Sequence, residues 1–230
     1  MIMLLLIWSQ AAIACQIVTP QQIANALQNS PTLSSSLKSC AMAAMAMGES
    51  GGGHTCANNN CCEGILQLNM SRYSQSARLI YRNSDLQTQV NGWAATANSN
   101  ATGSGYKILN AAYTSGQKMG GTTVTSGMLS ACEQFGNGVC SQNVAALQRT
   151  GTCGTYTDGA AHRGGQTICS WGHHADVQAS NQNCTLGACK SGGALPTLTT
   201  PNNSVGTPGE PVTTPQPTTN SIITTTPLTT

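Results

Sequence analysis

The sequence predicts a mostly α-helical domain that disulfide bonds stabilise, followed by a disordered tail. Apolar residues recur at steps of three or four along much of residues 15–190, the period of a helix that buries one face. The chain has eleven cysteines, enough for a framework of bridges. Residues 191–230 consist mainly of Thr, Pro, Ser, Gly and Asn, a composition that cannot bury enough apolar area to fold.

The N-terminus predicts export. Residues 1–14, MIMLLLIWSQAAIA, contain an apolar run and end in the A-x-A pattern of a signal peptide cleavage site. The run is too short to span a bilayer, so a periplasmic or secreted protein is expected. In such an oxidising compartment, many cysteines indicate disulfides.

Two interpretations of Cys15 stay open. The segment Ala12-Ile13-Ala14-Cys15 loosely resembles a bacterial lipobox, so Cys15 could carry a lipid anchor and leave ten cysteines for five bridges. Alternatively, Cys15 joins a disulfide and another cysteine stays free. Adjacent cysteines rarely bond to each other, so Cys61 and Cys62 are expected to have different partners.

Capping and periodicity predict the helices. Thr19-Pro20-Gln21-Gln22 can form a capping box that starts the first helix, and Asn29-Ser30-Pro31 ends it. Apolar positions predict a second helix from about Leu33 to Met47. Further helices are predicted over residues 71–82, 85–97, 107–115, 126–135 and 142–148. Short strands are predicted over 122–124 and 166–169, and residues 153–189 are expected to be rich in loops.

Composition argues against several classes of function. Charged residues make up only 7% of the chain and the net charge is +2, without a basic stripe, so no nucleic-acid partner is expected. His54 lies near Cys56, Cys61 and Cys62, but no C-x-x-C spacing accompanies them. We therefore expect no metal site.

A single glutamate closes the second predicted helix, in Gly48-Glu49-Ser50-Gly51-Gly52. Cleavage of a glycosidic bond requires a proton for the departing oxygen, and a carboxyl group in apolar surroundings can supply it. Met45, Ala46 and Met47 provide apolar neighbours, and the following glycines leave room for a sugar. A G-x-x-Q turn, Gly64-Ile65-Leu66-Gln67, follows one cysteine-rich loop later.

These two motifs resemble the lysozyme-like superfamily, in particular the lytic transglycosylases that cut peptidoglycan. The resemblance covers roughly residues 33–116 and implies a lysozyme-like helical domain with Glu49 as the general acid. It implies that Gly64 allows close approach of the glycan and that Gln67 hydrogen-bonds it, while Ser50 supports the glutamate or the substrate. The family also has an A-Y-N-x-G segment whose Tyr faces the catalytic Glu. Ala112-Tyr113-Thr114-Ser115-Gly116 matches it partly, with Thr114 in place of Asn, and assigns Tyr113 to the site.

The resemblance also implies a reaction and partners. A lytic transglycosylase needs only the glutamate, because the substrate's own 6-hydroxyl closes on the anomeric carbon and gives a 1,6-anhydro sugar. The partners expected are peptidoglycan glycan strands, in wall turnover, at a cell-envelope secretion apparatus or in attack on rivals. A monomer without a cofactor is expected.

Two alternatives stay open. A hydrolytic lysozyme would need a second carboxylate, for which Glu63, just before the turn, is the candidate. A disulfide-rich glycan-binding module without activity would also explain the cysteines and the tail.

Overall fold

The computed structural model describes residues 15–154, 166–182 and 184. The predicted signal peptide, the predicted tail and Cys189 lie outside these residues. By its contacts the chain divides into two units, Met1–Ala194 and Leu195–Thr230, and all described residues belong to the first. Helices form 61% of the described residues, against about 30–35% in an ordinary globular domain, which confirms the mostly helical fold class.

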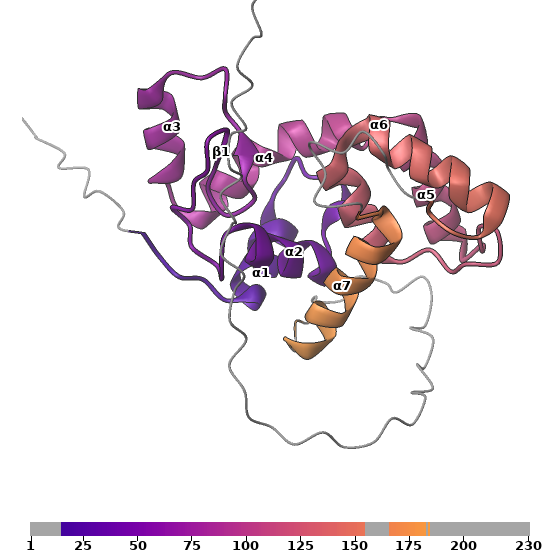
Figure 1. The fold of residues 1–230 in the computed structure, drawn as a ribbon. Helices are drawn as coiled ribbons and strands as arrows, with labels where there is room; N and C mark the ends of the chain where they lie inside the picture. The colour runs from indigo at the N-terminus through magenta and orange to yellow at the C-terminus, as the bar shows by residue number, and fades with distance from the viewer. Residues whose placement is uncertain (1–14, 155–165, 183, 185–230) are drawn as a thin grey trace, which may run out of the picture. The chain divides into compact units, whose positions relative to one another are not determined.

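The described elements are helices and one small hairpin (Figure 1). They are α1 (Pro20–Asn29), the 3-10 helix η1 (Ser35–Leu37), α2 (Cys40–Glu49), β1 (Cys62–Glu63), β2 (Leu68–Asn69), α3 (Gln75–Arg82), α4 (Leu86–Asn100), α5 (Ser104–Ser115), α6 (Ser126–Thr150) and α7 (Ile168–Asn181). None of these helices is both long and apolar enough to cross a membrane.

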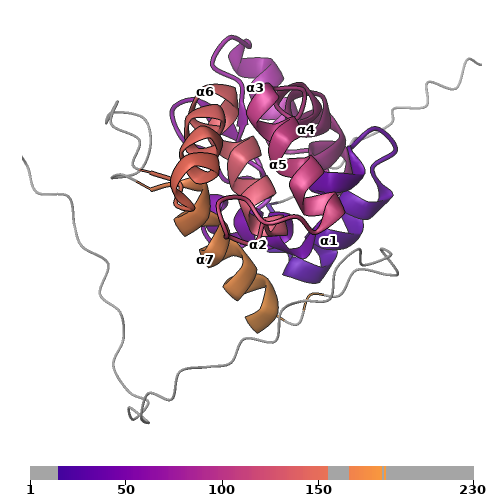
Figure 2. The same cartoon turned by 90° about the vertical axis from the view of Figure 1, so that its right-hand side faces the viewer.

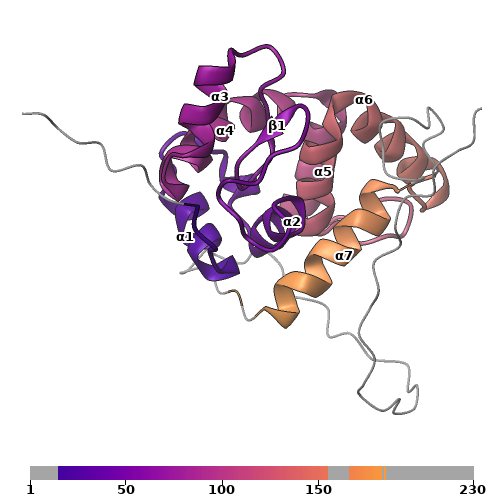
Figure 3. The same cartoon turned by 60° about the vertical axis from the view of Figure 1, so that its left-hand side comes forward.

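Helix α2 lies in the core. All its residues from Ala41 to Ala46 are buried, which explains its run of Ala and Met. It packs against α1, α6 and α7. Figures 2 and 3 both show α2 between α1 on one side and α7, in orange, on the other. Small side chains let these neighbours approach closely, so the last turn of α2 is held in a fixed position.

Most predicted helices are present, with shifted ends. The first is confirmed: Thr19 forms the expected capping box with Gln22, and the helix ends at Asn29. The second begins at Cys40 rather than Leu33, because the Ser39 side chain caps it by accepting a hydrogen bond from the backbone N–H of Met42. The two helices predicted over 126–135 and 142–148 correspond to the two parts of α6, which meet at Gly136, a non-helical residue with a φ of 75°; the second part begins earlier than predicted.

The strand predictions are wrong. Among residues 122–124, only Thr122 pairs, in an isolated bridge with Met119. Residues 166–169 lead into α7 instead, because Thr167 forms a capping box with Ser170. The stretch expected to be rich in loops therefore contains a helix of 14 residues. The only ladder between described strands joins β1 and β2, which flank the G-x-x-Q turn.

Five disulfides join ten of the eleven cysteines. The pairs are Cys15–Cys56, Cys40–Cys184, Cys61–Cys62, Cys132–Cys140 and Cys153–Cys169. The expectation that Cys61 and Cys62 have different partners is wrong. The Asn59 side-chain oxygen accepts hydrogen bonds from both of their backbone N–H groups, which tightens the chain there. Cys15 uses its sulfur in a bridge, which agrees with the disulfide interpretation and leaves no thiol for a lipid.

Candidate active site

Glu49 is the last residue of α2 and is half-buried. Beyond it, three consecutive glycines have left-handed backbone conformations and lead the chain away from the helix. No other atoms lie within 4 Å of the positions that a Cβ would take at Gly48, Gly51 and Gly52. The backbone at the end of the helix therefore borders open space at these glycines, whereas one carboxyl oxygen of Glu49, Oε1, is buried.

Ser50 closes the end of this helix. Its side chain is buried, and its hydroxyl donates a hydrogen bond to the Ala46 carbonyl oxygen at 2.7 Å. The Ser50 hydroxyl oxygen also accepts a hydrogen bond from the Gly53 backbone N–H at 3.0 Å. The structure thus places Ser50 in support of the backbone that carries Glu49, with its hydroxyl committed to that role.

A second carboxyl group, Glu133 of α6, lies near Glu49. Glu133 is only 3% exposed, and its Oε1 accepts a hydrogen bond from the Asn100 side-chain amide at 3.2 Å. Burial raises the pKa of Glu133 to about 7; the Asn100 hydrogen bond opposes this rise, and the charge of Glu49 adds to it. Helices α2 and α6 therefore bring two carboxyl groups together. Glu133 follows the buried Leu129 by one turn of α6, so an acidic residue that continues an apolar stripe was the sequence signal of its burial, although not of its contact with Glu49.

Two tyrosines of α5 belong to the same cluster. Tyr106 is buried, and its hydroxyl lies 2.8 Å from the Ser36 hydroxyl. Burial raises the pKa of Tyr106 to about 12, with smaller contributions from the charges of Glu133 and Tyr113. Tyr113 lies seven residues further along α5, on the same face of the helix. The structure thus links the predicted site residue Tyr113 to the carboxyl pair through Tyr106.

The side chain of Gln67, in the G-x-x-Q turn, makes its hydrogen bonds within the protein. Gln67 has a positive φ of 48°. Its amide nitrogen donates hydrogen bonds to the carbonyl oxygens of Gly64 at 2.8 Å and Ala57 at 3.3 Å, and its amide oxygen accepts one from Asn59 at 2.8 Å. All these bonds lie within one loop. The structure places Gln67 as a brace of this loop, whereas the resemblance implied a hydrogen bond to the substrate.

Gly64 lies where a side chain would not fit. Its φ is 77°, and a Cβ would stand 2.5 Å from the side-chain oxygen of Gln89. That oxygen accepts a hydrogen bond from the Ile65 backbone N–H. The close approach that Gly64 permits here is to Gln89, inside the protein.

Glu63 is held in ion pairs. It is 1% exposed, and its two oxygens lie 2.7 Å from Arg78 Nε and 3.5 Å from Arg82 Nη1. Arg78 also donates hydrogen bonds to the carbonyl oxygens of Asn59 and Asn60. Glu63 thus ties the loop to α3, and Glu133 is the carboxylate that accompanies Glu49.

Comparison of the chain with protein-family models, with curated proteins and with solved structures gives no match. The described residues contain no group of three or more His, Cys, Asp or Glu side chains that could hold a metal ion. Function is therefore inferred from the cluster of Glu49, Glu133, Tyr106 and Tyr113.

This cluster is suited to proton transfer. Glu49 is half-buried at a helix end, next to glycines whose backbone borders open space. Glu133 lies near it and is mainly protonated below about pH 7 because of its burial. Paired carboxyl groups in different environments are the usual arrangement for acid and base catalysis on sugars and other oxygen leaving groups.

Proposed function

We propose that the protein is a peptidoglycan lytic transglycosylase in which Glu49 is the general acid. The observation that carries the proposal is the position of Glu49, at the end of a buried helix, next to glycines that border open space and with Glu133 and the α5 tyrosines nearby. A small hairpin with a G-x-x-Q turn follows, as in the lysozyme-like superfamily. A lysozyme-like fold and export to the cell wall are parts of this proposal.

In the proposed reaction, the Glu49 carboxyl group donates its proton to the oxygen that joins N-acetylmuramic acid to N-acetylglucosamine. The bond between that oxygen and the anomeric carbon breaks. The 6-hydroxyl of the muramic residue then bonds to the anomeric carbon and returns its proton to the Glu49 carboxylate. The products are a 1,6-anhydro sugar and a free 4-hydroxyl group, and no water is consumed.

The position of Glu133 supports a second candidate, a hydrolytic lysozyme. Hydrolysis requires a carboxylate that activates water or forms a covalent intermediate. Glu63 was the candidate from sequence, but its two ion pairs occupy it. Glu133, which interacts electrostatically with Glu49, takes its place in this alternative.

The proposal is tested by digestion of purified peptidoglycan, with Glu49→Gln as the decisive variant. Glutamine keeps the shape of the side chain but has no proton to transfer. General acid–base catalysis contributes about 10²–10⁴-fold, so release of soluble fragments should fall at least that far. Equal unfolding midpoints of variant and parent serve as the control for folding. A folded Glu49→Gln protein with most of its activity would contradict the proposal. Binding to peptidoglycan without any cleavage by the parent would instead support the non-enzymatic binding module.

A further inference from the structure

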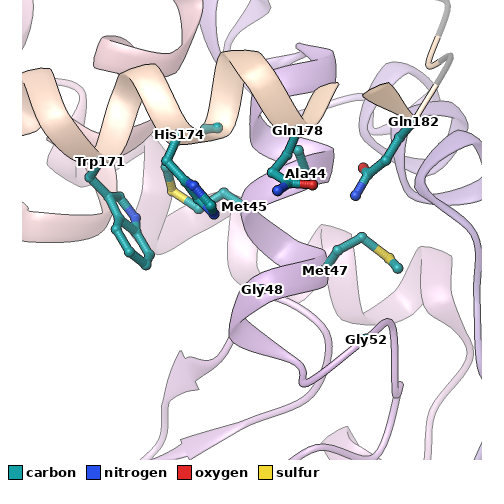
Figure 4. A pocket seen from close by; sticks show the side chains of 10 residues that line it. Ala44, Met45, Met47, Gly48, Gly52, Trp171, His174, Gln178 and Gln182 are labelled. Carbon is teal, nitrogen blue, oxygen red and sulfur yellow. The ribbon is translucent and has the colours of Figure 1, made fainter. Parts of the chain in front are cut away.

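An open cavity of about 320 Å³ lies between α2 and α7. Three residues of α7 line it, Trp171, His174 and Gln178, at steps of three and four that place them on one face of the helix, and Gln182, which caps the end of α7, continues this face. Figure 4 shows these four side chains on the side that faces Met45 and Met47 of α2. The resemblance that identified Glu49 does not extend to α7, so this face has no role in the site described above.

We propose that this cavity is a sugar-binding subsite for an N-acetylglucosamine unit of the glycan strand, an inference that rests on the proposed function. Its volume is at the lower end of the range of small-ligand pockets, about 300–1,000 Å³. Among the described residues, no Asp, Glu, Lys or Arg lines it, which suits a neutral sugar. The combination of an indole ring and two primary amides fits a pyranose, which has an apolar face and polar edges.

Trp171 provides the apolar surface. The residue is half-buried, and its ring lies next to those of Phe135 and His174, with centroid distances of 6.5 and 5.9 Å. These neighbours hold the indole in one orientation. A rigid aromatic ring gives a large contact area at little cost in conformational entropy, so it can pack against the C–H groups of a sugar ring.

Gln182 provides a side-chain amide that lines the cavity. Its oxygen is buried and makes no hydrogen bond with any of the described residues. A buried acceptor without a donor costs about 1–3 kcal/mol. A turn of the side chain would bring this oxygen to the cavity, where the N–H of an acetamido group would satisfy it, while Gln178 lies one turn earlier and can reach a hydroxyl group.

The cavity lies next to the proposed catalytic acid. Met45 and Gly48 line it, and Glu49 follows Met45 by one turn of α2, on the same face of the helix. A sugar in the cavity would therefore lie beside Glu49. This arrangement would hold one part of the strand while the neighbouring linkage meets the acid, as positioning for catalysis requires.

Helix α7 is fixed in place as a wall of the cavity. Its Asp176 accepts hydrogen bonds from the Gly127 backbone N–H at 2.8 Å and from the Ser126 hydroxyl at 3.2 Å. Gly127 and Gly172 bring α6 and α7 so close that a Cβ on either would meet the other helix. Beyond the C-terminal end of α7, the Cys40–Cys184 bridge ties the chain to α2. A preorganised wall of this kind lowers the entropic cost of binding.

Binding of the N-acetylglucosamine trimer tests the proposal. The Glu49→Gln protein with intact disulfides is titrated by calorimetry and by tryptophan fluorescence, so that cleavage cannot interfere. Trp171 is half-buried whereas Trp93 is 3% exposed, so Trp171 is expected to dominate the fluorescence response. We expect saturable binding that weakens by about 10-fold or more with Trp171→Ala and with Gln182→Leu, the loss that corresponds to about 1.4 kcal/mol. Trp171→Phe should restore part of it.

The control is Val177→Ala, which alters an exposed position of the same helix and should bind as the parent does. The absence of trimer binding, or unchanged affinity in folded Trp171→Ala and Gln182→Leu proteins, would overturn the subsite. Either result would concern the subsite alone. The proposed function would still be decided separately, by the cleavage assay on the parent protein, which has Glu49. Conversely, trimer binding that depends on Trp171, in a protein that never cleaves peptidoglycan, would retain the sugar site and reject the transglycosylase.

Discussion

Glu133 of α6 lies close enough to Glu49 of α2 for the two carboxyl groups to interact electrostatically. Burial is the larger cause that raises the pKa of Glu133 to about 7, and the charge of Glu49 adds to it. Glu133 is therefore mainly neutral in weak acid, where it can hold a proton within the cluster. Residues that are far apart in sequence thus form one unit whose charge depends on pH.

The first prediction concerns stability as a function of pH. The folded protein keeps a proton on Glu133 up to about pH 7, whereas the unfolded chain releases it near 4.5. Since the folded state binds more protons in this window, the free energy of unfolding should fall as pH rises from about 4.5 to 7, by about 3 kcal/mol, and should stay level above it. Below pH 4.5 both states are protonated, and this contribution is fully present.

Glu133→Gln should remove this dependence. Glutamine cannot ionise, and any cost of its buried amide is the same at both ends of the window. Urea denaturation of parent and variant at pH 5 and pH 8 measures the difference. We expect the parent to lose more stability than the variant between the two pH values. Equal losses in both proteins would show that Glu133 does not carry a raised pKa.

The second prediction concerns the products. If Glu49 acts alone, fragments should be lighter by one water than hydrolysis products, and their ends should resist reduction by borohydride, because a 1,6-anhydro sugar has no free reducing group. Mass analysis of the digest measures both. Glu133→Gln should change the rate but not the kind of product. Reducible products that disappear in Glu133→Gln would instead establish the hydrolytic alternative.

Local signals predicted the helices well where capping and periodicity agreed. Thr19 and Gln22 form the capping box that the sequence indicates, and Glu49 lies at the end of a buried helix as expected. The start of α2 was misplaced, because an apolar stripe through Leu33 and Leu37 continues the helical period although the backbone there forms only the short 3-10 helix η1 and no α-helix. Those residues are buried in the same core, so periodicity alone cannot find the boundary.

The rest of the site depends on long-range packing. Nothing near Glu133 in sequence indicates that it meets Glu49, since the contact arises from the way α6 packs on α2. The role of Gln67 was also hidden, because its partners Ala57 and Asn59 come from the opposite side of the loop. Residues 166–169 have the composition of a strand, yet the Thr167 cap and the packing of α7 on α6 determine a helix.

The third prediction concerns Gly64. Gln89, which a Cβ at this position would strike, is fixed by hydrogen bonds from its amide to the carbonyl oxygens of Thr55, Arg82 and Ser84. Gly64→Ala should therefore lower the free energy of unfolding by about 2–4 kcal/mol, from backbone strain and a displaced buried amide. Gly116→Ala is the matched control, since Gly116 has a similar φ of 69° but no atoms within 4 Å. It should cost only about 1–2 kcal/mol. Equal losses in urea denaturation would contradict the clash with Gln89.

The fourth prediction concerns the disulfide pairing. Cys132 and Cys140 both lie between Lys118 and Arg149, with no other Lys or Arg in the segment, so trypsin should release them in one peptide. That peptide should be unlinked and lighter by two hydrogens than its reduced form. The bridges Cys15–Cys56, Cys40–Cys184 and Cys153–Cys169 should join four other tryptic peptides into one species. Thiol counting on the denatured, unreduced protein should find no more than one free cysteine, because ten are paired.

The longest of these bridges should also matter most for stability. Cys40–Cys184 spans 144 positions, and a closed loop of this length contributes up to about 5 kcal/mol in the chain-entropy model, less where other bridges already shorten it. A Cys40→Ser and Cys184→Ser double variant should therefore unfold at lower urea concentration than a Cys61→Ser and Cys62→Ser variant, whose bridge closes almost no loop. The Cys40→Ser and Cys184→Ser double variant should also bind the N-acetylglucosamine trimer more weakly, because the chain after α7 is no longer bridged to α2. Several free thiols in the untreated protein would overturn the disulfide framework. Equal urea midpoints for the two double variants would contradict the prediction that Cys40–Cys184 contributes most to stability.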